Sequence, residues 1–183
     1  MLRAAGWTLV VSDPVEPADV IVVPKWAGEA GALEAAELVR AGIAPRVAIL
    51  LRPPSAATDQ LARRGLIASE DWITHLTRVL GVASVEEIPS RVEGSEAEGE
   101  VLPEWCDRNQ FRSIVVVTSA DHSRRVRRIL RRTMKGRPVK VMIRSARYSE
   151  FDPDRWWQTR DGVRTEIEEL EKLMLDILAH PLS

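Results

Sequence analysis

The sequence predicts an α/β domain in which helices cover both faces of a mostly parallel central sheet. Short apolar runs alternate along the chain with longer segments of helical periodicity, and this order is typical of parallel strands joined by crossover helices. Each run is rich in valine and isoleucine and lacks strict polar alternation, as in strands that are buried on both faces. The expected fold is therefore a three-layer α/β/α sandwich.

Four apolar runs are expected to be parallel neighbours in one sheet. They are ADVIVVP (18–24), PRVAILL (45–51), SIVVVTS (113–119) and VKVMIR (139–144). Because a helical segment separates each run from the next, crossover connections are expected rather than hairpins. The segment EEIP (86–89) predicts one more short strand.

The segments between the strands carry helix start and stop signals. Their ranges are 29–42, 69–81, 95–109 and 121–136. Glycine is favoured where a helix ends in a residue of left-handed conformation, and three of these segments end at or next to a glycine: Gly42, Gly81 and Gly136. Ser69 and Ser95 are candidate N-caps, and Ser95-x-x-Glu98 matches a capping box.

The end of the chain predicts a helix over about 161–180 that packs on the domain. Its apolar residues fall on one face, with charges opposite: Ile167, Leu170, Leu173, Met174 and Ile177. The segment RPPSAATD (52–59) is expected to be a loop at the end of a strand. The sequence has no internal repeat, so residues 1–183 are expected to form a single domain.

The composition excludes several classes of protein. A net charge of -1 gives no overall field that would attract nucleic acid or a membrane surface. The single cysteine, Cys106, excludes an internal disulfide, and three scattered histidines provide no zinc-type cluster, so no metal is expected. No apolar run is long enough for a membrane span or a signal peptide. The cofactor, if any, cannot be deduced from these features.

Ligands of open α/β sheets bind beyond the carboxyl ends of the strands, where three polar segments are expected here. The first is PKWAG, in which Lys25 is either a positive charge at the site or an exposed lysine. Trp26 beside it either stacks on a planar ligand or covers the sheet edge. The second is the 52–59 loop, and the third is TSADHS (118–123).

The TSADHS segment is the strongest candidate site. Thr118 and Ser119 end a strand, Ser119 or Asp121 is a candidate helix cap, and His122 and Arg125 follow in the first helical turn. Amide groups at a helix N-terminus together with a guanidinium group favour a phosphate or a carboxylate. The next four arginines, by contrast, are expected to form a solvated helix face: Arg127, Arg128, Arg131 and Arg132.

Several catalytic signatures are missing from the sequence. It contains no G-x-G-x-x-G, no G-x-x-x-x-G-K-[ST] and no G-x-S-x-G. A triad of Ser119, His122 and Asp121 is rejected, because residues so close in sequence do not align a nucleophile, a base and an orienting group in series.

The chain resembles the DUF218 (YdcF-like) family. The resemblance rests mainly on T-S-x-x-H-x-x-R, matched by Thr118, Ser119, His122 and Arg125, and on a Ser-x-x-Glu element, matched by Ser95 and Glu98. It implies a Rossmann-like fold, a small-molecule site at the strand ends and, in several members, a role in the bacterial cell envelope behind an N-terminal membrane anchor. The family's glycine-rich first turn and its arginine are replaced here by PKWAG and EAGALEAA.

These features favour a protein that binds a small anionic, phosphate- or nucleotide-like molecule at the strand ends. In an enzymatic version, acting as a hydrolase or transferase, Arg125 holds the anion, His122 transfers a proton and Glu98 orients His122 or acts as a base. The main alternative is a non-catalytic envelope scaffold. A nucleic-acid contact through the arginine-rich helix is disfavoured by the net charge. The start of the chain fits either a cytoplasmic protein or an exported domain separated from its anchor.

Overall fold

A computed structural model describes residues 2–66, 71–89 and 94–181. Its centre is a five-stranded sheet in the order β3-β2-β1-β4-β5, and every pair of neighbouring strands is parallel. The strands are β1 (Val20–Pro24), β2 (Val47–Leu51), β3 (Val85–Pro89), β4 (Ser113–Thr118) and β5 (Lys140–Ser145). The predicted fold class is therefore confirmed, as are the four parallel runs and the short strand at 86–89.

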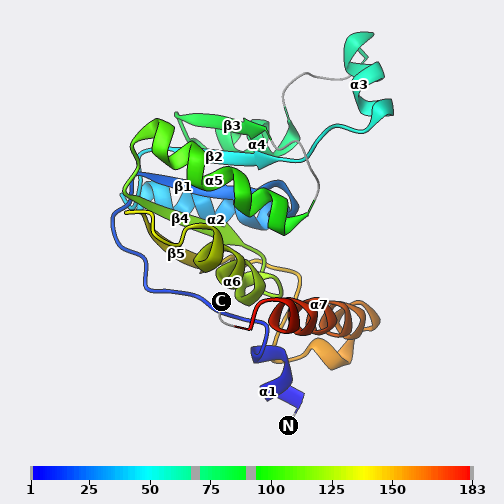
Figure 1. Cartoon of the computed structure of the whole chain (residues 1–183). Coiled ribbons are helices and arrows are strands. Elements are labelled where there is room, and N and C mark those ends of the chain that lie inside the picture. The colour runs from blue at the N-terminus through cyan, green and yellow to red at the C-terminus, as the bar shows by residue number, and fades with distance from the viewer. Residues whose placement is uncertain (1, 67–70, 90–93, 182–183) are drawn as a thin grey trace.

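Helices cover both faces of this sheet (Figure 1). The helices α2 (Gly28–Arg40) and α4 (Trp72–Val79) pack their apolar residues against one face. The helices α5 (Ser95–Asn109) and α6 (Ser123–Thr133) pack against the other. The residues of β1 and most of β4 are fully buried between the two layers, which explains their unbroken runs of valine and isoleucine.

Most helix ends agree with the sequence signals. A positive φ is found at each of the three predicted C-terminal glycines, with values of 75° at Gly42, 94° at Gly81 and 80° at Gly136. The predicted cap Ser69 lies outside the described residues, and Asp71 caps α4 by accepting a hydrogen bond of 2.9 Å from the amide of Ile73.

Two short α-helices and two 3-10 turns were not expected from the sequence. The helix α3 (Ala56–Arg63) forms where a loop was predicted, because Ser55 caps it by accepting a hydrogen bond from the Thr58 amide. The helix α1 (Leu2–Trp7) begins the described chain, and the 3-10 turn η2 (Trp156–Gln158) precedes the final helix. A second 3-10 turn, η1 (Lys25–Ala27), joins β1 to α2.

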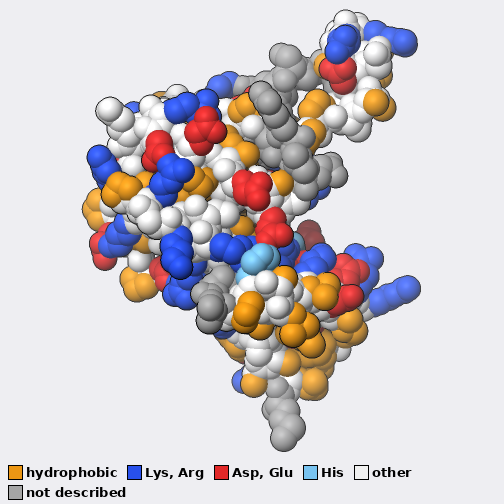
Figure 2. All heavy atoms as spheres, viewed as in Figure 1, with side chains coloured by type: hydrophobic (Ala, Val, Ile, Leu, Met, Phe, Trp, Pro, Cys, Tyr) orange, Lys and Arg blue, Asp and Glu red, His pale blue; other side chains and the backbone are white. Residues whose placement is uncertain are grey.

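The final helix, α7 (Arg160–Ala179), packs on α6 through a different face from the predicted one. Leu173 is buried, but Ile167 and Met174 are 59% and 61% exposed. The buried face instead carries Glu166, Glu169 and the nearly buried carboxylate of Asp176. The apolar side chains of α7 gather on the outer surface of the molecule (Figure 2). None of the described helices is long and apolar enough to cross a membrane.

Candidate functional site

A crevice opens beyond the carboxyl ends of β1 and β4. These neighbouring strands continue into helices on opposite faces of the sheet, β1 through η1 into α2 and β4 into α6. Such a reversal of direction is where open α/β sheets bind their ligands. The cavity there has a volume of about 430 Å³ and is lined by residues 26–30, 148–151, part of 119–122 and the start of α7.

His122 lines this cavity, and both nitrogens of its ring have polar neighbours. Its Nδ1 lies 2.6 Å from a carboxylate oxygen of Asp121 and 3.0 Å from the hydroxyl oxygen of Ser119. Its Nε2 lies 3.4 Å from a carboxylate oxygen of Glu169 on α7. The ring also stacks on Trp26, with 4.6 Å between the ring centres. Three separate elements therefore fix the orientation of the imidazole.

The carboxylate of Asp121 is stabilised in its charged form by these contacts. Burial on its own raises the pKa of Asp121, but the hydrogen bonds from His122 and Ser119 outweigh burial and hold the pKa below its ordinary value. Ser119 and Asp121 both face Nδ1 of the same imidazole. A nucleophile and an orienting acid must face opposite nitrogens, so the geometry agrees with the rejection of a triad here.

Glu98 reaches His122 only through Trp26. The indole Nε1 of Trp26 donates a hydrogen bond of 2.6 Å to Glu98, whose carboxylate is buried. Glu98 was expected to orient His122 or to act as a base; Asp121, Ser119 and Glu169 already occupy both ring nitrogens, so any orienting effect of Glu98 passes through Trp26. Glu98 instead fixes the tryptophan on which the imidazole stacks.

The predicted capping box of α5 does not form. Gly94 is the N-cap, and Ser95 is the first helical residue rather than the cap. The Glu98 side chain does not return to the helix start, because it accepts the hydrogen bond from Trp26. Ser95 lines two hollows beside α5, and neither of them is the His122 cavity.

The predicted cationic ligands pair with carboxylates of the protein itself. Arg125 donates from Nε and Nη2 to one oxygen of Glu169, at 3.1 and 3.0 Å. The ammonium group of Lys25 lies 2.5 Å from a carboxylate oxygen of Asp71. Thr118 is buried at the end of β4. Of the seven residues singled out from the sequence, His122 and Ser119 line the cavity directly.

The N-terminus of α6 is covered by the beginning of the chain. The Arg124 amide donates to the carbonyl oxygen of Leu9 at 3.0 Å, and the Ser123 hydroxyl donates to the same oxygen. His122 is the N-cap residue and, within the described chain, no side chain caps this helix, so the predicted caps Ser119 and Asp121 are wrong. Ser119 and Asp121 contact the imidazole instead.

The N-terminus of α2 faces the cavity instead. Ala27, Gly28, Glu29 and Ala30 line its wall. The N-cap position, Ala27, has no oxygen in its side chain, and among the described residues no side chain caps this helix. The positive end of the α2 dipole is therefore directed at the crevice. No Gly-rich motif marks this turn in the sequence.

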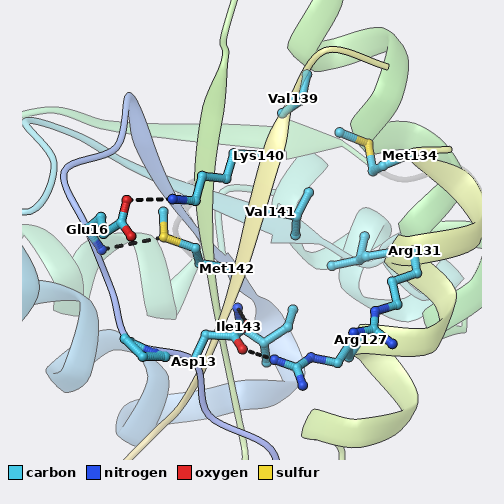
Figure 3. Close-up of a pocket in the computed structure, with 12 residues that line it drawn as sticks. Asp13, Glu16, Arg127, Arg131, Met134, Val139, Lys140, Val141, Met142 and Ile143 are labelled. Atoms are coloured by element: carbon cyan, nitrogen blue, oxygen red, sulfur yellow. Dashed lines mark hydrogen bonds and ion pairs between the residues drawn. The ribbon is translucent and has the colours of Figure 1, made fainter. Parts of the chain in front are cut away.

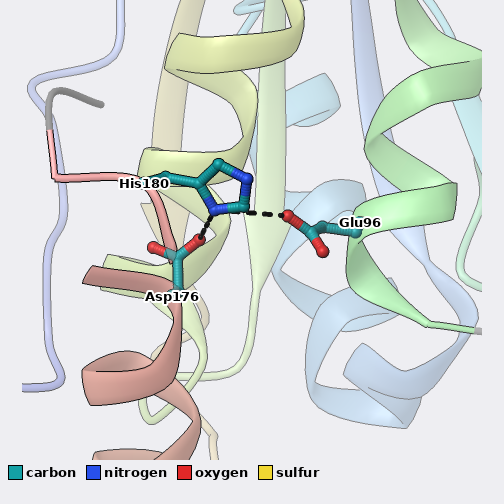
Figure 4. Close-up of side chains that lie close together, drawn as sticks. All are labelled: Glu96, Asp176 and His180. Atoms are coloured by element: carbon teal, nitrogen blue, oxygen red, sulfur yellow. Dashed lines mark ion pairs between the residues drawn. The ribbon is translucent and has the colours of Figure 1, made fainter. Parts of the chain in front are cut away.

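A second cluster of titratable side chains joins the start of α5 to the end of α7 (Figure 4). Single ligand atoms of Glu96, Asp176 and His180 all lie within 4.8 Å of one another, as a metal site would require. Arg132 pairs with both carboxylates, and Arg128 pairs with Asp176. These guanidinium groups already supply the positive charge that a bound cation would bring.

Comparisons with known proteins add little to this geometry. No family model matches the chain, and no curated protein matches it. Among solved structures, the chain is similar to a universal stress protein from Archaeoglobus fulgidus in complex with dAMP. The TM-score is 0.38 and the identity 18%, over 71% of this chain and 98% of the other. The protein thus has an α/β fold with a cavity at the reversal between β1 and β4.

Proposed function

We propose that the β1–β4 crevice binds a small molecule bearing a phosphate group, of the nucleotide or sugar-phosphate type. The observation that carries the proposal is the cavity itself, in which the N-terminus of α2 and His122 line the same space. The Gly28 amide donates to the carbonyl oxygen of Lys25, but no described side chain caps this helix. The first-turn amide groups of a helix are hydrogen-bond donors aligned with the helix dipole, and together they favour a phosphate. The imidazole of His122, stacked on the indole of Trp26, forms the adjoining wall of the cavity.

The rest of the cavity suits the neutral part of such a ligand. Glu29, Glu150 and Asp161 contribute carboxylates to its lining, and these groups accept hydrogen bonds from sugar hydroxyls or exocyclic amino groups. Trp26 and Tyr148 contribute aromatic surface for a ring. The carboxylates also disfavour a ligand that is anionic throughout, so a phosphate attached to a hydroxyl-bearing group fits better than a polyphosphate.

Binding is supported more strongly than catalysis. Ser119 and Asp121 share one nitrogen of His122, and Glu98 is tied to Trp26, so the residues singled out from the sequence do not align in series. Glu169 faces the other ring nitrogen, but it is also paired with Arg125 and Lys172. Kinship with the DUF218 family remains part of the proposal and rests on the motif of Thr118, Ser119, His122 and Arg125 at the β4–α6 junction. An envelope role rests on the same motif.

Isothermal titration calorimetry with AMP, adenosine and inorganic phosphate tests the proposal. AMP is expected to bind more tightly than either fragment, because it uses both the α2 terminus and the carboxylate-lined part of the cavity. His122→Ala is expected to weaken AMP binding about tenfold, because it removes the ring that lines the cavity and on which Trp26 stacks. His75→Ala, on α4 and outside the cavity, is the matched control. Equal binding by the two variants, or no heat from millimolar AMP, would contradict the proposal.

A further inference from the structure

A groove of about 500 Å³, lined by other residues than the His122 crevice, runs along the outer edge of the sheet (Figure 3). Its floor is β5, the last strand of the sheet. One wall is α6, which presents Arg127, Leu130, Arg131 and Met134. The other wall is the N-terminal segment at 13–16. The N-terminal segment already bonds the outer edge of β5 at Ile143 and Ser145, so the groove exposes the part of this edge around Val141.

Part of this strand edge has free backbone groups. In a parallel sheet, alternate residues of a strand hydrogen-bond to the same neighbouring strand. The Lys140 amide donates to the carbonyl oxygen of Arg112, which precedes β4, so the even-numbered residues of β5 bond to β4. The odd-numbered residues therefore point outward. Ile143 exchanges hydrogen bonds with Asp13 there. Val141 is in the same orientation, and no partner for its outward N–H or C=O is found among the described residues.

The α6 wall carries positive charge that the protein does not fully neutralise. Arg127 forms an ion pair with Asp13. Arg131, one turn further along α6, is exposed and has no ion pair within the described part of the chain. Burial, and secondarily the charge of Arg131, lower the pKa of Arg127, which indicates that the two guanidinium groups repel each other. An added carboxylate between them would relieve this repulsion.

We propose that the β5 edge binds an extended acidic peptide segment of a partner protein by strand addition. The outward N–H and C=O of Val141 pair with the peptide backbone, as exposed sheet edges do with added strands. Alternate side chains of an added strand point to the same face of the sheet. On the α6 face, acidic side chains of the peptide meet Arg131 and Arg127, while Leu130 and Met134 contact its aliphatic stems. Charge complementarity thus selects this occupant.

Fluorescence anisotropy with a labelled, blocked heptapeptide of alternating glutamate and valine tests the charge requirement. The full chain is expected to bind this peptide and to bind its glutamine counterpart at least about tenfold more weakly. Arg131→Ala is expected to weaken glutamate-peptide binding by about tenfold as well. Arg108→Ala is the matched control, because Arg108 is an exposed arginine of α5 that does not line the groove. Equal binding of the two peptides, or equal loss in the two variants, would overturn the proposal.

A second pair of variants tests strand addition itself. Val141→Pro removes the outward N–H but no hydrogen bond to β4, so the sheet is retained. Val141→Ala removes a similar part of the side chain and keeps the N–H. Binding is expected to be lost in the proline variant and kept in the alanine variant, with circular dichroism confirming that both fold. Equal affinities, displacement of the peptide by millimolar inorganic phosphate alone, or self-association of the chain through this edge would each show that the groove has a different occupant.

Discussion

At the scale of single residues, Glu166 is the buried charge that the fold leaves least well satisfied. It lies on the inner face of α7 with 1% of its surface exposed, and neither carboxylate oxygen has a hydrogen-bond partner among the described residues. Burial raises the pKa of Glu166 above its ordinary value, because removal from water disfavours the charged form. Its neighbour one turn along, Glu169, is instead paired with Arg125.

Replacement of Glu166 by glutamine is expected to stabilise the protein at neutral pH. When the pKa of a carboxyl group is higher in the folded than in the unfolded protein, its contribution to the free energy of unfolding is fully present below the unfolded pKa. That contribution is lost as the pH rises through the folded pKa. The variant removes that pH-dependent penalty, so its gain should be about 1 kcal/mol or more at pH 7 to 8 and should vanish near pH 4. Urea unfolding at several pH values measures it. Glu168→Gln, an exposed position of the same helix, should show no such pH-dependent gain.

The same scale shows what the sequence could and could not reveal about the site. His122 and Ser119 were found because they follow a strand and begin a helix, which is a local pattern. Glu169 was missed because it lies far along the chain on α7, and only the packing of α7 on α6 brings it to the imidazole. Arg125 was correctly placed in the first turn of α6, but its carboxylate partner could not be foreseen, and that partner decides its role.

At the scale of elements, α6 and α7 join through a charged seam instead of an apolar one. Arg125 pairs with Glu169, and Arg128 and Arg132 pair with Asp176. The expectation that Arg128 and Arg132 form a solvated face is therefore wrong, whereas Arg127 and Arg131 do face outward along the β5 groove. Apolar periodicity misled the prediction for α7 because it assigns every carboxylate to the solvent side.

Two adjacent residues of α7 test this orientation. Leu173 is 5% exposed and packs with Leu9 and Phe151, whereas Met174 is 61% exposed. Leu173→Ala should lower the free energy of unfolding by about 2–5 kcal/mol, the range for a buried large-to-small change. Met174→Ala should change it by less than about 0.5 kcal/mol, as surface substitutions do. Chemical denaturation measures both, and a larger loss for Met174 would restore the face predicted from the sequence.

The elements that were predicted well share a physical origin. Strands buried on both faces require unbroken apolar runs, and glycine is needed where a helix ends in a left-handed residue, so both leave a direct trace in the sequence. The capping box at Ser95 failed for the opposite reason. The residues Ser95 and Glu98 have the spacing of a capping box, but the Glu98 carboxylate accepts a hydrogen bond from Trp26, which is distant in sequence.

At the scale of the whole molecule, stability is unevenly distributed. The five strands lie between two layers of helices, whereas α3 stands away from the sheet (Figure 1) and has no buried residue. Within the described residues its side chains form one ion pair, the exposed contact between Arg63 and Asp59, and surface pairs of this kind contribute about 0–1 kcal/mol. An eight-residue helix without tertiary packing is marginal in water. Local unfolding of α3 should therefore cost far less than global unfolding.

Limited trypsin digestion of the native protein should accordingly cut first after Arg63 or Arg64. Both arginines belong to the end of α3, where the backbone opens without disturbing the core. Arg128 and Arg132 of α6 are held by carboxylates of α7 and should be cut only after global unfolding, because a protease requires an extended segment in its active site. Mass spectrometry of the first fragments identifies the cut, and replacing Arg63 and Arg64 together by glutamine should slow it. If the first fragments instead end within α6, the seam between α6 and α7 opens more readily than α3, and the proposed order of local stabilities is wrong.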